Sequence, residues 1–171
     1  MSAAKHAAIV ELGPRWSVTA DQAAADDALA RAFGRRAPRL LDVGTGTGEA
    51  TRAWAADHPD HDVIAVELHR PGIARLLGDL EQSGPTNVRV LEADVTVLLD
   101  AMAPGVIHAV RALFPDPWPK RRHVARRLVD RAFVGRVADL LAVDGWLHLA
   151  TDWADYADQM REALAAEPRL T

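Results

Sequence analysis

The sequence predicts an α/β fold in which a mostly parallel β-sheet carries helices on both faces. Short apolar runs rich in β-branched residues alternate with segments of helical pattern, which is typical of such sheets. A glycine-rich turn directly follows the first of these runs, as happens where a strand leads into a helix. The 171 residues are 49% hydrophobic and 26% charged, a balance that suits one globular domain.

Residues 1–20 contain Gly13-Pro14 and have no clear period, so we expect an N-terminal arm followed by one domain over residues 21–171. A first helix is expected from Asp21 to Phe33, with Asp21 as a candidate cap. The predicted strands are residues 40–43, 63–68, 88–91, 106–114 and 146–150. The predicted helices between them are residues 49–57, 72–82, 95–102 and 122–142. His108 and Arg111 are unusual in a strand that should be buried, and the pattern gives no reason for them.

Several classes of protein are excluded by composition. The absence of cysteine rules out disulfides, thiol catalysis and cysteine-based zinc sites. No apolar run approaches the roughly 20 residues that a membrane helix needs, and no secretory core follows the first residues. His58 and His61 flank Pro59 without further partners at ligand spacing, so no metal is expected. We therefore expect a cytoplasmic protein without a membrane or metal partner, and the sequence leaves its oligomeric state open.

The charge is unevenly distributed along the chain. Residues 111–136 contain eight Lys or Arg against two acids, although the whole chain has a net charge of −4. A basic segment on an acidic body suggests a local site for an anion such as a nucleic acid. A solvated helix face is the alternative explanation for such a run.

The glycine-rich turn reads Asp42-Val43-Gly44-Thr45-Gly46-Thr47-Gly48-Glu49. Gly44 and Gly46 are candidate ligand-binding residues, because glycine permits positive φ and close approach of the backbone to a ligand. A dinucleotide-binding turn needs a small residue where Glu49 stands, and this carboxylate would meet the pyrophosphate. The phosphate-loop pattern of NTPases is absent as well.

Three acids stand at successive strand ends. Asp42 ends the first apolar run and could face a cationic amine, whereas Glu67 closes the second strand, where a carboxylate accepts hydrogen bonds from ribose hydroxyls. Asp94 follows the third strand, at the same edge of the sheet. These residues suit a ligand with a ribose, an amino group and no phosphate, as in S-adenosylmethionine. Taken singly, Glu67 and Asp94 could instead simply cap helices.

The most informative segment is Phe114-Pro115-Asp116-Pro117-Trp118-Pro119-Lys120. Prolines on both sides of Asp116 restrict the backbone, so the turn should present one carboxylate rigidly at the end of the fourth strand. Trp118 offers a flat surface on which a base can stack, and a buried tryptophan in a proline-rich loop is the structural alternative.

The residues after this turn predict a cationic helix face. Arg126, Arg127, Asp130 and Arg131 fall on one side of the predicted helix over residues 122–142. Together with Lys120 and Arg122, the three arginines of this face suit contacts to the phosphates of a polyanion, which position a chain without reading its sequence.

Taken together, these motifs resemble those of the bacterial tRNA (guanine-N7)-methyltransferases. The resemblance rests on the segment around Asp116 with the following arginines, on the glycine turn, and on Ala150-Thr151-Asp152-Trp153 with Tyr156. It extends from about Leu12 to Met160, and the segment around Asp116 is its most specific part.

The resemblance implies a class I methyltransferase fold (Rossmann-like) that uses S-adenosylmethionine and methylates N7 of a guanosine in the variable loop of tRNA. It places the cofactor-binding acids at Asp42, Glu67, Asp94 and Asp116, the catalytic carboxylate at Asp116, and tRNA contacts at Lys120 and Asp152. In that family the chain continues through a Thr-x-Phe-Glu segment and two more strands, whereas this sequence ends at Thr171. The last strands of the fold are therefore expected to be missing, which would leave one sheet edge uncovered.

Two other functions remain open at this point. An amino-methyltransferase acting on adenine or cytosine also uses a proline turn with a carboxylate or amide beside the methyl donor, although it does not need the Lys-Arg run. A catalytically inactive module that binds RNA or cofactor is the second alternative, because the C-terminal part is short.

Overall fold

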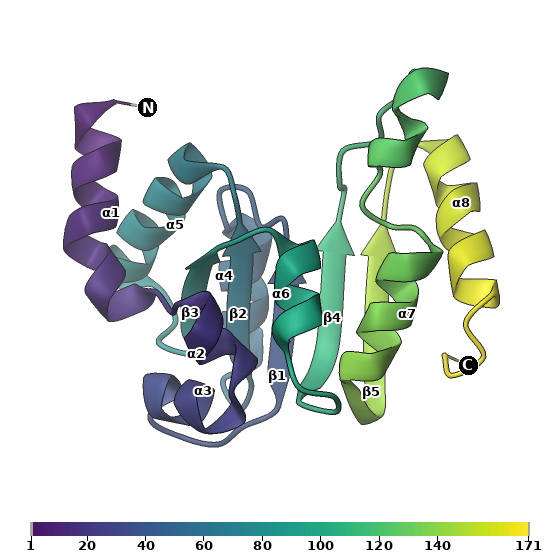
Figure 1. The fold of residues 1–171 in the computed structure, drawn as a ribbon. Coiled ribbons are helices and arrows are strands. Elements are labelled where there is room, and N and C mark those ends of the chain that lie inside the picture. The colour runs from purple at the N-terminus through teal and green to yellow at the C-terminus, as the bar shows by residue number, and fades with distance from the viewer. Residues whose placement is uncertain (1, 171) are drawn as a thin grey trace.

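The computed structural model describes residues 2–170, which form a five-stranded sheet with helices on both faces (Figure 1). The strand order is β3-β2-β1-β4-β5, and all neighbouring strands are parallel. The strands are β1 (Arg39–Val43), β2 (Asp62–Glu67), β3 (Val88–Glu92), β4 (Ile107–Leu113) and β5 (Leu141–Ala150). The helical segments are α1 (Ala3–Trp16), α2 (Ala20–Ala24), α3 (Asp26–Phe33), α4 (Glu49–Asp57), α5 (Arg70–Ser83), α6 (Val95–Ala101), the 3₁₀ segment η1 (Arg121–Arg126), α7 (Arg131–Leu140) and α8 (Ala154–Ala165). The predicted α/β class and parallel sheet are confirmed.

Alternating strand residues supply two apolar cores, one on each face of the sheet. Leu40 and Val63 pack with apolar residues of α1, α4 and α5. Leu41 and Ile64 point the other way and pack with residues of α2, α3, α6, α7 and α8. Burial on both faces explains why the strands consist of nearly continuous apolar runs. Since all strands run in the same direction, the loops that follow them meet at one edge of the sheet.

The segment expected to be an arm is largely helical. Helix α1 packs against α5, and Trp16 at its end is only 4% exposed. The indole Nε1 of Trp16 donates a 2.6 Å hydrogen bond to Glu81 of α5, and Val18 N donates to Val90 O of β3. Burial of one large aromatic side chain therefore holds a segment in which the sequence showed no clear helical period.

The first predicted helix, over residues 21–33, is in fact two helices. Ala25, between α2 and α3, has an extended backbone with φ −113° and ψ 121°. Asp21 does not cap α2, contrary to expectation, because Thr19 does. The hydroxyl of Thr19 accepts from Gln22 N while Thr19 N donates to the Gln22 side chain, which satisfies two helix-end groups at once.

The single long helix predicted over residues 122–142 is wrong. The 3₁₀ segment η1 ends at Arg126, the chain is extended at Arg127 with φ −61° and ψ 132°, and α7 begins only at Arg131. Asp130 starts the new helix by accepting a 2.8 Å hydrogen bond from Phe133 N. The extended stretch also lets the fully buried Val129 enter the core.

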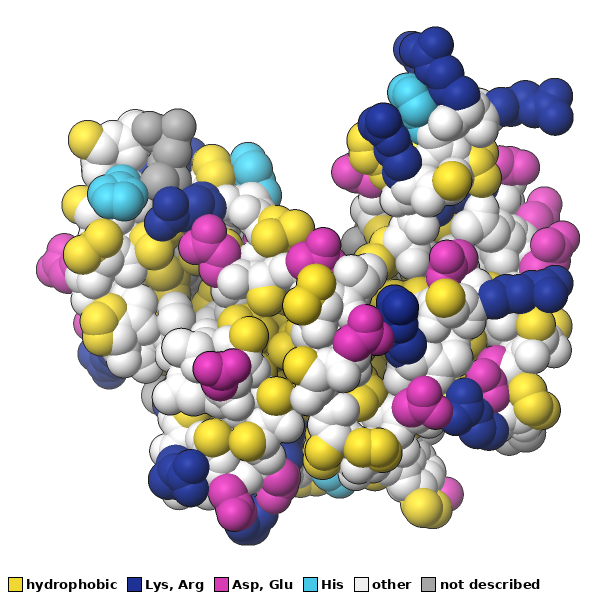
Figure 2. Space-filling model, viewed as in Figure 1, with side chains coloured by type: hydrophobic (Ala, Val, Ile, Leu, Met, Phe, Trp, Pro, Cys, Tyr) yellow, Lys and Arg dark blue, Asp and Glu magenta, His cyan; other side chains and the backbone are white. Residues whose placement is uncertain are grey.

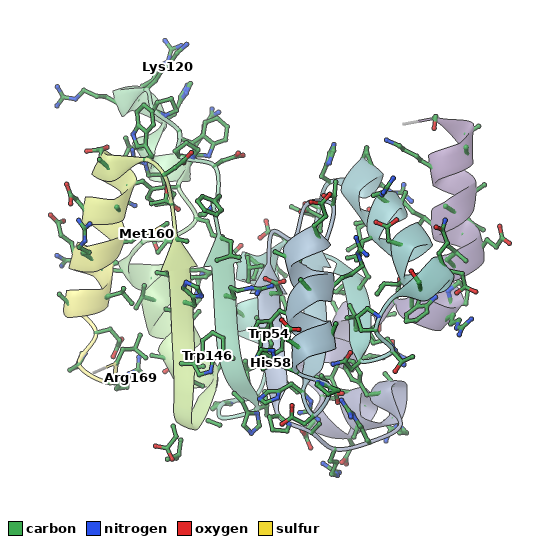
Figure 3. All side chains as sticks on the ribbon, turned by 180° about the vertical axis from the view of Figure 1, so that it is seen from behind. Trp54, His58, Lys120, Trp146, Met160 and Arg169 are labelled. Atoms are coloured by element: carbon green, nitrogen blue, oxygen red, sulfur yellow. The ribbon has the colours of Figure 1, made fainter. Side chains whose placement is uncertain are left out.

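Strand β5 is longer than predicted, since it already begins at Leu141. Its register against β4 is interrupted between Ile107 and Ala109, and Asp144 has φ 64°. Trp146 on this strand is 42% exposed, and Figure 3, which views the molecule from behind, places it on β5, away from helix α4. Helices α1, α4 and α5 thus cover mainly β1, β2 and β3 on that side.

His108, which the sequence left unexplained, lies at the exposed start of β4. Its Nδ1 accepts a 3.2 Å hydrogen bond from Arg39 N of β1. Desolvation, followed by the charge of Arg39, lowers the pKa of His108. A neutral ring with an unprotonated Nδ1 fits this contact.

Candidate active site

A pocket of about 710 Å³ lies at the carboxyl ends of β1, β2, β3 and β4. It is the place where ligands of open parallel sheets collect. The predicted site residues that line it are Gly44, Glu67, Asp94, Asp116, Trp118 and Arg126. Tertiary structure thus brings together residues that lie far apart in the sequence.

The glycine turn, residues 44–48, adopts positive φ at each of its glycines. A Cβ added at Gly72 of α5 would overlap the carbonyl oxygen of Gly46, and one at Gly48 would overlap the Leu76 side chain. The turn is therefore packed tightly onto α5 from behind. Gly44, in contrast, lines the pocket, and a Cβ added there would meet no atom within 4 Å. This open space lets a ligand approach the backbone.

Glu67 ties the glycine turn to the end of β2. Its Oε2 accepts a 2.7 Å hydrogen bond from Gly46 N, and its Oε1 accepts from Leu68 N and His69 N at 2.7 Å each. Each carboxylate oxygen has two lone pairs, so the group retains acceptor capacity toward the pocket that it lines.

Asp42 lies beneath the glycine turn and is only 3% exposed. Its oxygens accept hydrogen bonds from Arg111 Nε at 3.0 Å, Arg111 Nη2 at 2.6 Å and the Thr51 hydroxyl at 2.7 Å. The cation that faces Asp42 is therefore Arg111 of β4, the neighbouring strand, instead of the amine of a ligand. This bidentate pair also explains how a charged residue is accommodated in β4.

Asp94 caps α6 at the end of β3. Its Oδ1 accepts from Thr96 N at 2.9 Å and from the Thr96 hydroxyl at 2.7 Å. Both bonds use the same oxygen, so Oδ2 is available to a ligand in the pocket that Asp94 lines. Asp94 is thus a helix cap and a pocket residue at the same time.

The proline turn, residues 114–119, forms the other side of the pocket. Phe114 and Trp118 both have positive φ, 52° and 41°, which is uncommon for residues other than glycine. Asp116 between them is exposed and makes no hydrogen bond to any residue of the described range 2–170. Phe114, which the sequence did not single out as a site residue, lines the pocket and is 64% exposed.

Trp118 is held by two neighbours from η1. The Arg126 guanidinium carbon lies 5.0 Å from the centre of the indole, and the His123 ring meets it edge-on at 5.7 Å. Trp118 is therefore partly buried within a small cluster, yet it still lines the pocket. His123 was not identified from the sequence, since only its neighbours stood out by charge.

The segment from Lys120 to Arg126 forms a basic projection above the pocket. Figure 2 shows Lys and Arg side chains at its tip, beside a hollow in the surface, and Figure 3 places Lys120 at the outermost point. Lys120, Arg122 and Arg126 are all exposed. The predicted common face of Arg126, Arg127 and Arg131 does not exist, because the helix breaks at Arg127 and buries this side chain.

Asp152, the last predicted substrate contact, is exposed in the loop after β5. It lies at the same sheet edge but does not line the pocket. Within residues 2–170, no group of three or more metal-binding side chains comes together, and no helix is long and apolar enough to cross a membrane.

Comparison with known proteins agrees with this arrangement. A family model described as "Putative methyltransferase" matches residues 36–171. A tRNA (guanine-N(7)-)-methyltransferase of Alkalilimnicola ehrlichii is 47% identical over 99% of this chain and 72% of its own length. One of the same name from Thiobacillus denitrificans is 45% identical over 95% of this chain and 71% of its own.

Solved structures support the fold. A precorrin-6y C5,15-methyltransferase from Geobacter metallireducens matches 75% of this chain and 62% of its own, with a TM-score of 0.59 and 17% identity. The antibiotic-resistance methyltransferase Kmr matches 83% of this chain and 81% of its own, with a TM-score of 0.57 and 22% identity. These likenesses confirm the class I methyltransferase fold, while the sequence relatives show the family. The chain belongs to the tRNA (guanine-N7)-methyltransferases.

Proposed function

We propose that this protein transfers a methyl group from S-adenosylmethionine to N7 of a guanosine in the variable loop of tRNA, in the cytoplasm. The proposal rests on the position of the Asp116 carboxylate. This group accepts no hydrogen bond from residues 2–170, and it lines the same pocket as Gly44, Glu67 and Asp94. The basic projection beside this pocket supplies the positive charge that a polyanionic substrate needs.

We assign the methyl donor to the side of the pocket formed by Gly44, Glu67 and Asp94. The free space at Gly44 admits a ligand, Glu67 can accept hydrogen bonds from ribose hydroxyls, and Asp94 Oδ2 can accept from an amino group. The apolar side chains of Leu68 and Val95 line the same pocket and suit a flat purine. Bound there, S-adenosylmethionine supplies a methyl group activated by its positively charged sulfur.

Two of the predicted cofactor residues act from behind the pocket in this proposal. Gly46 donates its N–H to Glu67 and so fixes this carboxylate, and Asp42 holds Arg111 and Thr51 beneath the turn. Both residues shape the site without lining it. Their role is therefore to position the groups that touch the donor.

We assign the guanine base to the proline turn. N7 of guanine has an exposed lone pair, so attack on a methyl group does not require a proton to be removed first. The work of the protein is then alignment and control of charge, because the base becomes cationic as the reaction proceeds. Asp116 can accept hydrogen bonds from guanine N–H groups and stabilise this charge, and Trp118 or Phe114 can contact the base.

The remaining predicted substrate residues surround the turn. Lys120, Arg122 and Arg126 are exposed cations for phosphate contacts, and Asp152 stands after the neighbouring strand. Arg126 serves twice in this proposal, because it also packs on the Trp118 ring.

The test uses the purified protein, unmodified tRNA and methyl-labelled donor, followed by mapping of the modified nucleotide. We expect label at N7 of a variable-loop guanosine and none in DNA. Label on an adenine or cytosine amino group would instead support an amino-methyltransferase. Binding of donor and tRNA without any transfer would overturn the enzymatic proposal and leave a binding module.

A further inference from the structure

The proline turn has few contacts that hold its shape. Within residues 2–170, two hydrogen bonds connect it to the rest of the protein. Phe114 N donates to Ala150 O at 2.8 Å, and Pro117 O accepts from Arg127 Nε at 2.8 Å. The prolines lack N–H groups, and positive φ at Phe114 and Trp118 is unfavourable unless the surroundings impose it. Arg126 and His123 pack on the Trp118 ring, whereas Arg127 is the side chain that hydrogen-bonds to the backbone of the turn.

Arg127 is itself fixed from the opposite side by α8. Its side chain is 2% exposed, and its Nη1 donates to Gln159 at 2.9 Å and its Nη2 to Asp155 at 2.7 Å. The guanidinium carbon also lies 4.9 Å from the ring centre of Tyr156. Every nitrogen of this guanidinium thus has a partner within the protein. The planar guanidinium donates to three acceptors at once, Pro117 O, Gln159 Oε1 and Asp155 Oδ2, which a lysine with one nitrogen cannot do.

A neighbouring set of contacts fixes the chain on which Arg127 stands. Tyr156 is fully buried and accepts a 2.8 Å hydrogen bond from Val129 N, while Gln159 Nε2 donates to Val129 O at 2.8 Å. Burial raises the pKa of Tyr156, which keeps its hydroxyl protonated. Helix α8 therefore holds the backbone after η1 as well as the Arg127 side chain.

We infer that Arg127 is a positioning residue, which acts through Pro117 to hold Asp116 in the geometry that methyl transfer requires. The inference rests on the proposed function. The inference gives Arg127 a different role from Arg126, its neighbour in the sequence. Arg126 is exposed and can contact a phosphate, whereas the Arg127 guanidinium is buried and cannot. Two adjacent arginines thus have different tasks, and α8 takes part in the site without touching the pocket.

The test compares Arg127→Lys with Arg161→Lys in the complete protein. Lysine keeps the charge but has a single nitrogen, so it cannot satisfy Pro117, Gln159 and Asp155 together. Arg161 is a matched control on α8, since its side chain is 71% exposed and pairs only with Asp158 in the described range. Thermal melting first shows that both variants are folded. Arg127→Ala serves as a second variant.

Two measurements are made on each folded variant. In single turnover with saturating donor and tRNA, Arg127→Lys should be slower by about 30-fold to 100-fold, as expected for misplacement of a catalytic group by about 1 Å. The dissociation constants for donor and tRNA, and the salt dependence of tRNA binding, should stay within about twofold of the wild type, because no phosphate contact is lost. In a peptide covering residues 112–120, hydrogen exchange of the Phe114 amide, which donates to Ala150 O, should become faster. Arg161→Lys should match the wild type in both measurements.

Other outcomes overturn the inference in distinct ways. An unchanged single-turnover rate in both Arg127 variants would show that the turn does not depend on this side chain. A weaker salt dependence of tRNA binding, with unchanged hydrogen exchange in the turn, would make Arg127 a phosphate contact. If the wild-type protein transfers no methyl group to tRNA, the proposed function fails, whereas the exchange measurement still decides whether Arg127 holds the turn.

Discussion

The glycine turn after β1 and the proline turn after β4 line the same pocket, but different interactions hold them. The glycine turn is held by tight packing on α5 and by backbone hydrogen bonds from Gly44 N to Val66 O and from Gly48 N to Thr45 O, each at 2.9 Å. One side chain, Glu67, adds a hydrogen bond from Gly46 N. The proline turn is restricted by its prolines, makes one backbone hydrogen bond from Phe114 N to Ala150 O, and is otherwise contacted by side chains, among them the buried Arg127. The donor side of the pocket thus depends on close backbone packing, while the acceptor side depends on a few side chains. Substitutions on the donor side should therefore change stability and donor affinity, whereas substitutions on the acceptor side should change turnover.

The largest effect is expected beneath both turns, where Asp42 and Arg111 join β1 to β4. Arg111→Leu would leave the Asp42 charge buried without its cation, and breaking such a pair costs about 3–5 kcal/mol. Chemical denaturation should show this loss of unfolding free energy. The double variant Asp42→Asn/Arg111→Leu should recover part of it, because the unpaired charge is removed. Equal stability of Arg111→Leu and the wild type would mean that the pair contributes nothing.

Asp116→Ala should affect catalysis almost as strongly but leave the fold unchanged. Removing one preorganised charge-stabilising group costs about 10²-fold to 10³-fold in turnover. Single-turnover kinetics should show this loss, while the dissociation constant of the methyl donor changes much less. Asp116→Asn, which keeps the shape of the side chain, separates the contribution of charge from that of geometry. Full activity of Asp116→Ala would remove this residue from the catalytic role.

Gly72→Ala tests the packing of the glycine turn. The added methyl group would push against the Gly46 carbonyl, and overpacking of this kind costs about 1–3 kcal/mol. Donor affinity, measured by calorimetry, should fall together with stability, whereas the turnover of bound substrate should change little. Gly78→Ala is the control in the same helix, since a Cβ there meets no atom within 4 Å. It should stabilise the protein by up to about 1 kcal/mol.

The smallest effect per residue is expected on the basic projection. Replacing Lys120, Arg122 and Arg126 with alanine should weaken tRNA binding about tenfold and flatten its dependence on salt, with a slope that falls by about two to three. Binding measured at several salt concentrations checks this expectation. Arg131→Ala provides a comparison, because Arg131 lies at the start of α7, beyond the break in the predicted helix. If the salt dependence of tRNA binding is unchanged in the triple variant, the basic projection does not contact phosphates and is only solvated surface.

Several features of this protein follow from the sequence because they depend on local patterns. The apolar runs predict the strands, the spacing of glycines predicts the turn, and the prolines around Asp116 predict a loop at the end of β4. Because strands of a parallel sheet end at one edge, it also follows that Glu67, Asp94 and Asp116 line one pocket. None of these inferences needs knowledge of a distant partner.

Only the tertiary structure decided which charged side chains serve the fold. Asp42 and Arg111 are 69 residues apart in the chain, and Arg127 lies 28 residues from Asp155, so no local period relates them. A helical period placed Arg127 beside Arg126 and Arg131 on one surface, whereas the cap at Asp130 and the burial of Val129 broke that helix and turned Arg127 inward. A buried charge is stable only where its partners converge from other elements, and those elements meet only when the chain has folded.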